Sequence, residues 1–102
     1  MSPKSTRSSP TAARVVEVVA YPAVQLLDVT GPLQVFATAN DLMAKAGEPR
    51  PYEIRLVAPQ GQKVNASAGV ALVAEPLSPA DTSVDTLVVA GGQGAPQLSA
   101  FA

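Results

Sequence analysis

Two short runs of β-branched residues place the strongest constraint on how this chain folds. Residues 14–20 read RVVEVVA and residues 86–90 read TLVVA. Each run has the length of a strand, and a proline or glycines follow it. Because both faces of each run are mainly apolar, the runs are typical of strands covered on both sides, as in a parallel sheet. Glu17 is the exception, and we expect it at a sheet edge or beside a partner side chain.

A helix is predicted between these two strands. Residues 33–46 are rich in alanine, and Gly47 follows where a left-handed residue would end the helix. Pro32 is compatible only with the first turn, so we expect the helix to begin there, with Asp28 or Thr30 capping its free amides. The side chains expected to share one face of this helix are Leu33, Phe36, Ala37, Asn40 and Met43.

The remaining pattern predicts an α/β fold. Residues 52–58 (YEIRLVA) form a second strand that ends at a proline. Residues 63–65 and 70–74 flank a small-residue tip at 67–69, which predicts a hairpin. Residues 95–102 have the composition of the start of another helix. The order of strand, helix, strand, hairpin and strand predicts a mostly parallel sheet with flanking helices.

The chain divides into a tail and an incomplete domain. Residues 1–13 are rich in serine, threonine and proline and have no hydrophobic period, so we expect a disordered tail in preference to a transit peptide. Residues 14–102 supply one full helix to a sheet that needs cover on both faces. We therefore expect the N-terminal part of a domain, or a unit that completes itself by self-association.

The composition excludes most catalytic chemistry. The chain has no cysteine and no histidine, and therefore no thiol nucleophile, no thiolate ligand and no imidazole base. A net charge of −1 gives no reason to expect nucleic-acid binding. The acidic residues match no calcium-binding pattern, and no apolar stretch approaches the ~18 residues of a membrane span. We expect a cytoplasmic protein that is not an enzyme and holds no metal or cofactor.

Two loops that follow predicted strands contain the candidate ligand-pocket residues. Asp28 lies at the junction of loop and helix, and is either a helix cap or a carboxylate that faces a ligand. Gly91 and Gly92 follow the last strand, where glycines let the backbone turn and point its amides at an anion or oxyanion. The alternative is a tight strand-to-helix turn. Both loops follow strands at the edge where open α/β sheets bind ligands.

Three segments together resemble a known family. RVVEVVAYPAVQ at 14–25, LLDVTGPLQVFATAN at 26–40 and TLVVAGGQG at 86–94 are similar to the start of the ThiJ/PfpI superfamily, which is class I glutamine-amidotransferase-like. The combination of LDxxGPLxVFxxAN with VxGGxG most resembles the N-terminal sensing domain of AraC-family transcriptional regulators. The resemblance covers residues 14–102.

The resemblance implies a flavodoxin-like sandwich with a pocket at the strand edge. In catalytic relatives such as isonitrile hydratases, an acidic residue of the first loop lies against a cysteine nucleophile. Asp28 matches the acidic residue, and Gly91 and Gly92 match glycines whose amides lie near the pocket. The cysteine elbow, and the helix-turn-helix module of the regulators, belong to parts of such proteins that this sequence does not reach.

The expected function follows from that resemblance. We expect a truncated ligand-sensing domain of the AraC-regulator type, with a small-molecule effector and without catalysis or DNA binding of its own. We also expect a homodimer formed through an exposed surface, and no membrane partner. One alternative is the N-terminal fragment of an isonitrile-hydratase-like enzyme of the same superfamily. A second is a small interaction protein that associates with itself.

Overall fold

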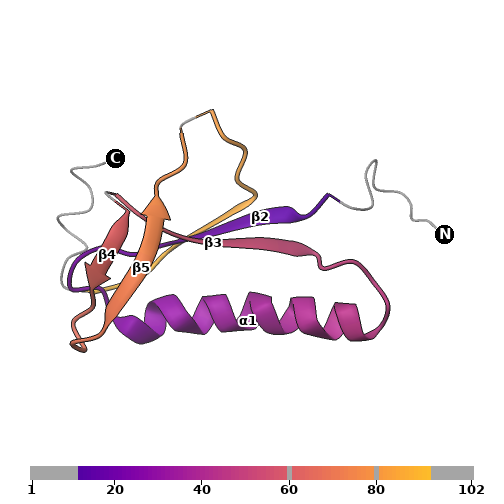
Figure 1. The fold of residues 1–102 in the computed structure, drawn as a ribbon, viewed down its shortest axis with the longest axis horizontal. Helices are drawn as coiled ribbons and strands as arrows, with labels where there is room; N and C mark the ends of the chain where they lie inside the picture. The colour runs from indigo at the N-terminus through magenta and orange to yellow at the C-terminus, as the bar shows by residue number, and fades with distance from the viewer. Residues whose placement is uncertain (1–11, 60, 80, 93–102) are drawn as a thin grey trace.

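A computed structural model describes residues 12–59, 61–79 and 81–92 (Figure 1). The elements are β2 (Arg14–Val19), α1 (Leu26–Lys45), β3 (Tyr52–Ala58), β4 (Gln62–Asn65), β5 (Ala71–Pro76) and β6 (Thr86–Val89). They form a five-stranded sheet in the order β4-β5-β3-β2-β6, and α1 lies along one of its faces. The α/β fold, the mostly parallel sheet and the predicted strands and hairpin are confirmed.

The first strand lies in the middle of the parallel part of the sheet. β2 pairs in parallel with β3 on one side and with β6 on the other, so that Val18 is aligned with Leu56 and Val88. α1 makes the crossover that two adjacent parallel strands require. β5 extends the parallel part beyond β3, whereas β4 pairs only with β5 and in the antiparallel direction. The carboxyl ends of β2 and β6 therefore lie next to each other.

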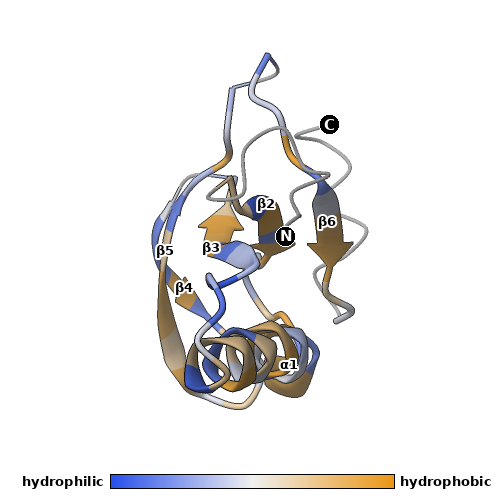
Figure 2. Cartoon of the chain, turned by 90° about the vertical axis from the view of Figure 1, so that its right-hand side faces the viewer, coloured by the Kyte–Doolittle hydropathy of each residue, from blue (hydrophilic) through white to orange (hydrophobic). Residues whose placement is uncertain are grey.

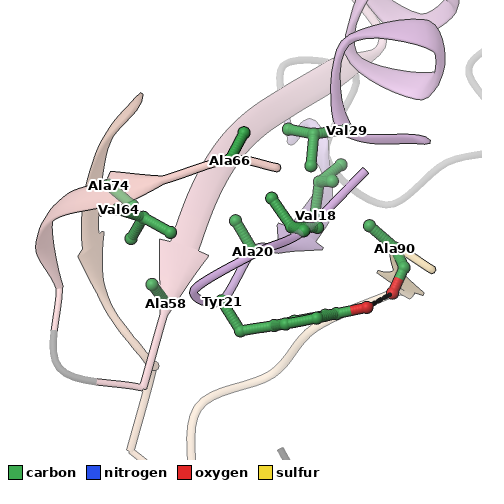
Figure 3. Packing of buried hydrophobic residues seen from close by; sticks show 10 residues of the cluster. Val18, Ala20, Tyr21, Val29, Ala58, Val64, Ala66, Ala74 and Ala90 are labelled. Atoms are coloured by element: carbon green, nitrogen blue, oxygen red, sulfur yellow. Dashed lines mark hydrogen bonds between the residues drawn. The ribbon is translucent and has the colours of Figure 1, made fainter. Parts of the chain in front are cut away.

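Small side chains make up most of the buried core around the sheet and the start of α1. The buried cluster consists of Val18, Ala20, Tyr21, Val24, Val29, Ala58, Val64, Ala66, Ala74 and Ala90, most of which Figure 3 labels. Tyr21 is its largest member, and its side chain extends from the end of β2 toward Ala90. Valine and alanine give such a core many small contacts at close range, so helix and sheet pack closely.

The helix begins earlier than the sequence predicts. α1 starts at Leu26 with Gln25 at its N-cap, so Asp28 and Thr30 lie inside the helix and cap nothing with their side chains. Pro32 is likewise inside α1, beyond the first turn to which its ring was expected to confine it. Gly31 eases the strain, because it has no Cβ to clash with the proline ring that follows it. The predicted end is confirmed, since α1 stops at Lys45 and Gly47 has a φ of 81°.

The predicted inner face of α1 is confirmed except at its last member. Asn40 is buried, Phe36 is half-buried, and Met43 is exposed. The side chain of Asn40 accepts a hydrogen bond from the amide of Tyr52 and donates one to its carbonyl, both at 2.9 Å. The ring of Phe36 meets the ring of Tyr52 edge to face, with centroids 4.9 Å apart. Helix and β3 are thereby joined at the start of the strand.

The face of the sheet that points away from α1 carries a buried charge. Glu17 is only 3% exposed and lies at the middle of β2, not at a sheet edge, but the predicted partner is present. The guanidinium of Arg55 lies 3.4 Å from its carboxylate, and the hydroxyl of Ser78 donates a hydrogen bond to the same oxygen. Leu87 and Val89 flank this group on β6 and remain more than half exposed.

Some expectations concern parts of the chain outside the described residues. These are the disordered tail, for residues 1–11, and the helix start at 95–102. Within the described part of the chain, no helix has the length and apolar character that a membrane crossing requires.

Candidate functional site

The two loops singled out in the sequence meet at the carboxyl ends of β2 and β6. The amide of Gly91 donates a hydrogen bond of 3.1 Å to Oδ2 of Asp28, across 63 positions of sequence. Asp28 is in the first turn of α1, where the helix dipole favours a negative charge. Its carboxylate is exposed, whereas Gly91 is partly buried. The site is therefore an exposed carboxylate held against a strand end.

Gly92 has a geometric need for glycine, and Gly91 is closely approached by the Asp28 side chain. An ideal Cβ on Gly91 would lie 2.7 Å from Oδ2 of Asp28. Gly92 has a φ of 152°, and a Cβ there would lie within 3 Å of backbone atoms of Ala23, Val24 and Gln25. Glycine allows the strand end and the loop before α1 to approach this closely.

The loop before α1 is fixed from both sides. On the side of β6, the amide of Gln25 donates 2.9 Å to the carbonyl of Gly91, and Val24 forms an antiparallel bridge with Gly92. On the side of the hairpin, the carbonyl of Val24 accepts a 2.9 Å hydrogen bond from the amide of Ser67. These contacts hold the first turn of α1, and with it Asp28, in one position.

Tyr21 fixes the backbone beside the site. Its hydroxyl donates a 2.5 Å hydrogen bond to the carbonyl of Ala90, the residue before the glycine pair (Figure 3). Burial raises the pKa of the Tyr21 hydroxyl above its usual value of 10.0, and the negative charge of Asp28 raises this pKa further. The phenol therefore remains a neutral donor, and it fixes the peptide that carries the Gly91 amide.

This geometry limits the chemistry of the site. The amide of Gly91 donates to the chain's own carboxylate, so an anion that used this amide would have to displace Asp28. In the arrangement present, the group offered to a visiting molecule is the exposed carboxylate, which accepts hydrogen bonds. Among the described residues, no three acidic side chains gather as they would around a metal ion.

The amino-acid sequence indicates the two ends of this hydrogen-bond network but not the residues between them. Asp28, Gly91 and Gly92 were identified from their places after strands. Tyr21 and Gln25 were not, although a tyrosine directly after an apolar strand is a signal, because a buried hydroxyl needs a hydrogen-bond partner. The contribution of Gln25 comes from its backbone amide, for which the side chain gives no indication.

A curated protein is similar in sequence over most of this chain. No protein-family model matches the chain. An uncharacterized protein encoded in the cpoL 5′ region of Streptomyces lividans is 35% identical over 81 residues, which cover 79% of this chain and 53% of that protein. The chain thus spans about half the length of the curated relative that it matches.

Solved structures are similar over most of the chain. An AraC family transcriptional regulator from Pseudomonas putida superposes with a TM-score of 0.64 and 29% identity, over 78% of this chain and 47% of the other. A DJ-1 superfamily protein from Agrobacterium tumefaciens has a TM-score of 0.54 and 18% identity, over 82% and 40%. A candidate transcriptional regulator from Vibrio parahaemolyticus has a TM-score of 0.61 and 13% identity, over 89% and 46%.

These likenesses confirm the resemblance that the sequence motifs predicted. The last two neighbours share too little sequence to show more than a similar fold. The regulator from Pseudomonas putida adds sequence similarity to that fold. In each structural comparison the chain corresponds to less than half of the neighbour's length.

Proposed function

We propose that this chain, which has the fold of the ThiJ/PfpI superfamily, contributes the first part of a small-molecule-sensing domain of the AraC-regulator type. The effector would bind beside Asp28 and the glycine pair. The observation that carries this proposal is the hydrogen bond between Gly91 and Asp28, because it joins the loops after two adjacent parallel strands at the carboxyl edge of the sheet. Open α/β sheets bind their ligands at this edge.

The proposal assigns the chain neither catalysis nor DNA binding of its own. Its support is chemical, because the full sequence has no cysteine or histidine to act as nucleophile or base and a net charge of only −1. A cytoplasmic location is part of the same proposal, as is a homodimer. The similarity to a named AraC family regulator favours sensing over the alternative of a hydratase fragment.

Titration of the isotope-labelled chain with pools of small metabolites tests the effector site. We expect a binding pool to shift the amide resonances of Gly91 and Gly92, and expect Asp28→Ala to remove the shifts. The control is Asp41→Ala, because Asp41 is also an exposed acid of α1 but pairs with Arg50 at the other end of the helix. Shifts that are confined to other loops, or that persist in Asp28→Ala, would contradict the proposal.

The coding sequence downstream of residue 102 tests the domain prediction for 14–102. A continuous reading frame that reaches a helix-turn-helix module would support the regulator. A cysteine at a strand-to-helix elbow, followed by a final helix and a stop codon, would support the hydratase fragment.

A further inference from the structure

The turn between β2 and α1 contains an alanine in a conformation that favours glycine. Ala23 has a φ of 67°, in the left-handed region where the Cβ of an L residue crowds the backbone. The amide of Val24 donates a 3.0 Å hydrogen bond to the carbonyl of Tyr21 and so closes a turn around Pro22 and Ala23. A proline at the second place and a positive φ at the third are typical of a type II turn, whose third residue is ordinarily glycine or asparagine.

Contacts from two sides fix this turn. The amide of Ala23 donates a 2.8 Å hydrogen bond to the carbonyl of Asn65 at the end of β4. The carbonyl of Ala23 would lie 2.9 Å from a Cβ on Gly92, which follows β6. Figure 2 shows β4 and β6 at opposite sides of the sheet, so the turn lies between the hairpin and the end of β6. A left-handed alanine persists only where its surroundings fix it, and such residues are common at ligand sites.

The turn connects two groups that hold the end of β6. Tyr21, its first residue, donates its hydroxyl to the carbonyl of Ala90. Val24, its last residue, forms the antiparallel bridge with Gly92. With a negative φ at Ala23 the chain would leave the turn in another direction, and Val24 would not meet Gly92. The direction in which α1 begins therefore depends on the backbone of Ala23.

We propose that Ala23 is a positioning residue of the effector site, whose left-handed backbone aims the start of α1 so that Asp28 meets the amide of Gly91. This inference deepens the proposed function and rests on it wherever an effector is concerned. Ala23 acts through its backbone conformation, because its methyl group neither donates nor accepts a hydrogen bond. Its contribution is preorganisation, since a loop that is already in place does not have to be ordered when a ligand binds.

Three substitutions at position 23 separate backbone conformation from bulk. Glycine enters the left-handed region freely, and asparagine is several-fold enriched there, whereas a β-branched valine is an outlier. Asparagine and valine are similar in size, so each is the control for the other. We expect Ala23→Gly and Ala23→Asn to keep the contact between Asp28 and Gly91, and Ala23→Val to lose it.

The amide resonance of Gly91 reports this contact, because Asp28→Ala removes the acceptor of that amide. We expect Asp28→Ala to shift the resonance in the unmodified chain, in Ala23→Gly and in Ala23→Asn, but not in Ala23→Val. The amide of Val15 donates 2.7 Å to Asp85 at the other end of β2, and its unchanged resonance would show that the fold is intact. A folded Ala23→Asn protein without the contact, or Ala23→Val with it, would overturn the proposal. If Ala23→Val does not fold, Ala23→Asn decides alone.

The metabolite pools of the effector titration distinguish this proposal from the proposed function. We expect a pool that shifts Gly91 in the unmodified chain to bind Ala23→Asn about equally and Ala23→Val more weakly. If no pool binds the unmodified chain, the effector site is wrong, and the Gly91 resonance still decides the role of Ala23. If a pool binds folded Ala23→Val as tightly as the unmodified chain, the effector site does not need Ala23, and the proposal is refuted.

Discussion

The Oδ2 atom of Asp28 lies 2.7 Å from the position where a side chain on Gly91 would begin. Any other residue at position 91 therefore has to push the carboxylate away or move the end of β6. Since the same oxygen accepts the hydrogen bond of the Gly91 amide, close approach and hydrogen bond depend on each other. The contact between the end of β6 and the first turn of α1 thus uses the absence of a Cβ at Gly91.

Gly91→Ala should lower the free energy of unfolding by about 0.5–1.5 kcal/mol, because the new methyl group makes the exposed Asp28 carboxylate turn away and lose its hydrogen bond to the amide of residue 91. In an Asp28→Ala background the same substitution should cost much less, since the carboxylate it would meet is gone. Urea unfolding of the four proteins in this double-mutant cycle measures the difference. Equal costs in both backgrounds would show that Asp28 is not what makes glycine necessary.

Tyr21 should make the fold sensitive to alkali. Because its pKa is raised in the folded protein, the unfolded chain loses the phenolic proton first. The stabilising contribution is complete below the unfolded pKa of about 10 and is lost as the pH rises from there through the raised folded pKa. Unfolding midpoints measured between neutral and strongly alkaline pH check this, and Tyr21→Phe should flatten that part of the profile.

The absorbance of the phenolate gives the same pKa directly. The chain has two tyrosines, so Tyr52→Phe leaves Tyr21 as the sole phenol. We expect it to titrate above the range of a free tyrosine, and to titrate lower once Asp28→Asn removes the nearby charge. An ordinary tyrosine titration in the folded protein would contradict the burial of Tyr21 beside Asp28.

Asn40→Ala should cost about 1–3 kcal/mol of unfolding free energy, because it removes both partners of the Tyr52 backbone groups. Asn65→Ala on β4 is the same chemical change at an exposed position and should cost under about 0.5 kcal/mol. Thermal or urea unfolding compares the two. Similar costs for both variants would mean that water replaces the bonds of Asn40 without loss.

Arg55→Met should destabilise the fold by about 3 kcal/mol, because Glu17 would remain buried without its cation. Adding Glu17→Leu to this variant should recover most of the loss, since an uncharged pair no longer needs compensation. Urea unfolding at neutral pH measures both. A double variant no more stable than Arg55→Met would show that Glu17 draws its stability from Ser78 instead.

The strands and the meeting of the two loops could be predicted from the sequence. Runs such as YEIRLVA have the period and composition of strands, and β3 occupies the predicted residues. Asp28 and Gly91 could be assigned to one edge because both follow parallel strands, whose carboxyl ends share that edge. Neither inference needs knowledge of a particular side-chain contact.

The start of α1 could not be predicted, because it depends on tertiary packing. A proline inside a helix costs about 3 kcal/mol, which favours a start at Pro32. The earlier turn buries Val29 completely and packs Leu26 against the core, and such burial contributes about 1.5–3 kcal/mol per side chain. The burial offsets the proline, but it becomes visible only once the sheet is in place. The same holds for the hydrogen bond from Tyr21 to Ala90, 69 positions away.

The central position of β2 has a consequence for folding during synthesis. β2 is made first among the described strands, and β6, which covers its second side, is made last. At about 5–20 residues per second, one side of a valine-rich strand stays open for several seconds on the ribosome. Glu17 stands in the middle of that strand, and a charge at such a place disfavours pairing with the strands of other nascent chains. We therefore expect Glu17, which pairs with Arg55 and accepts a hydrogen bond from Ser78 in the folded protein, to oppose aggregation of β2 before the sheet is complete.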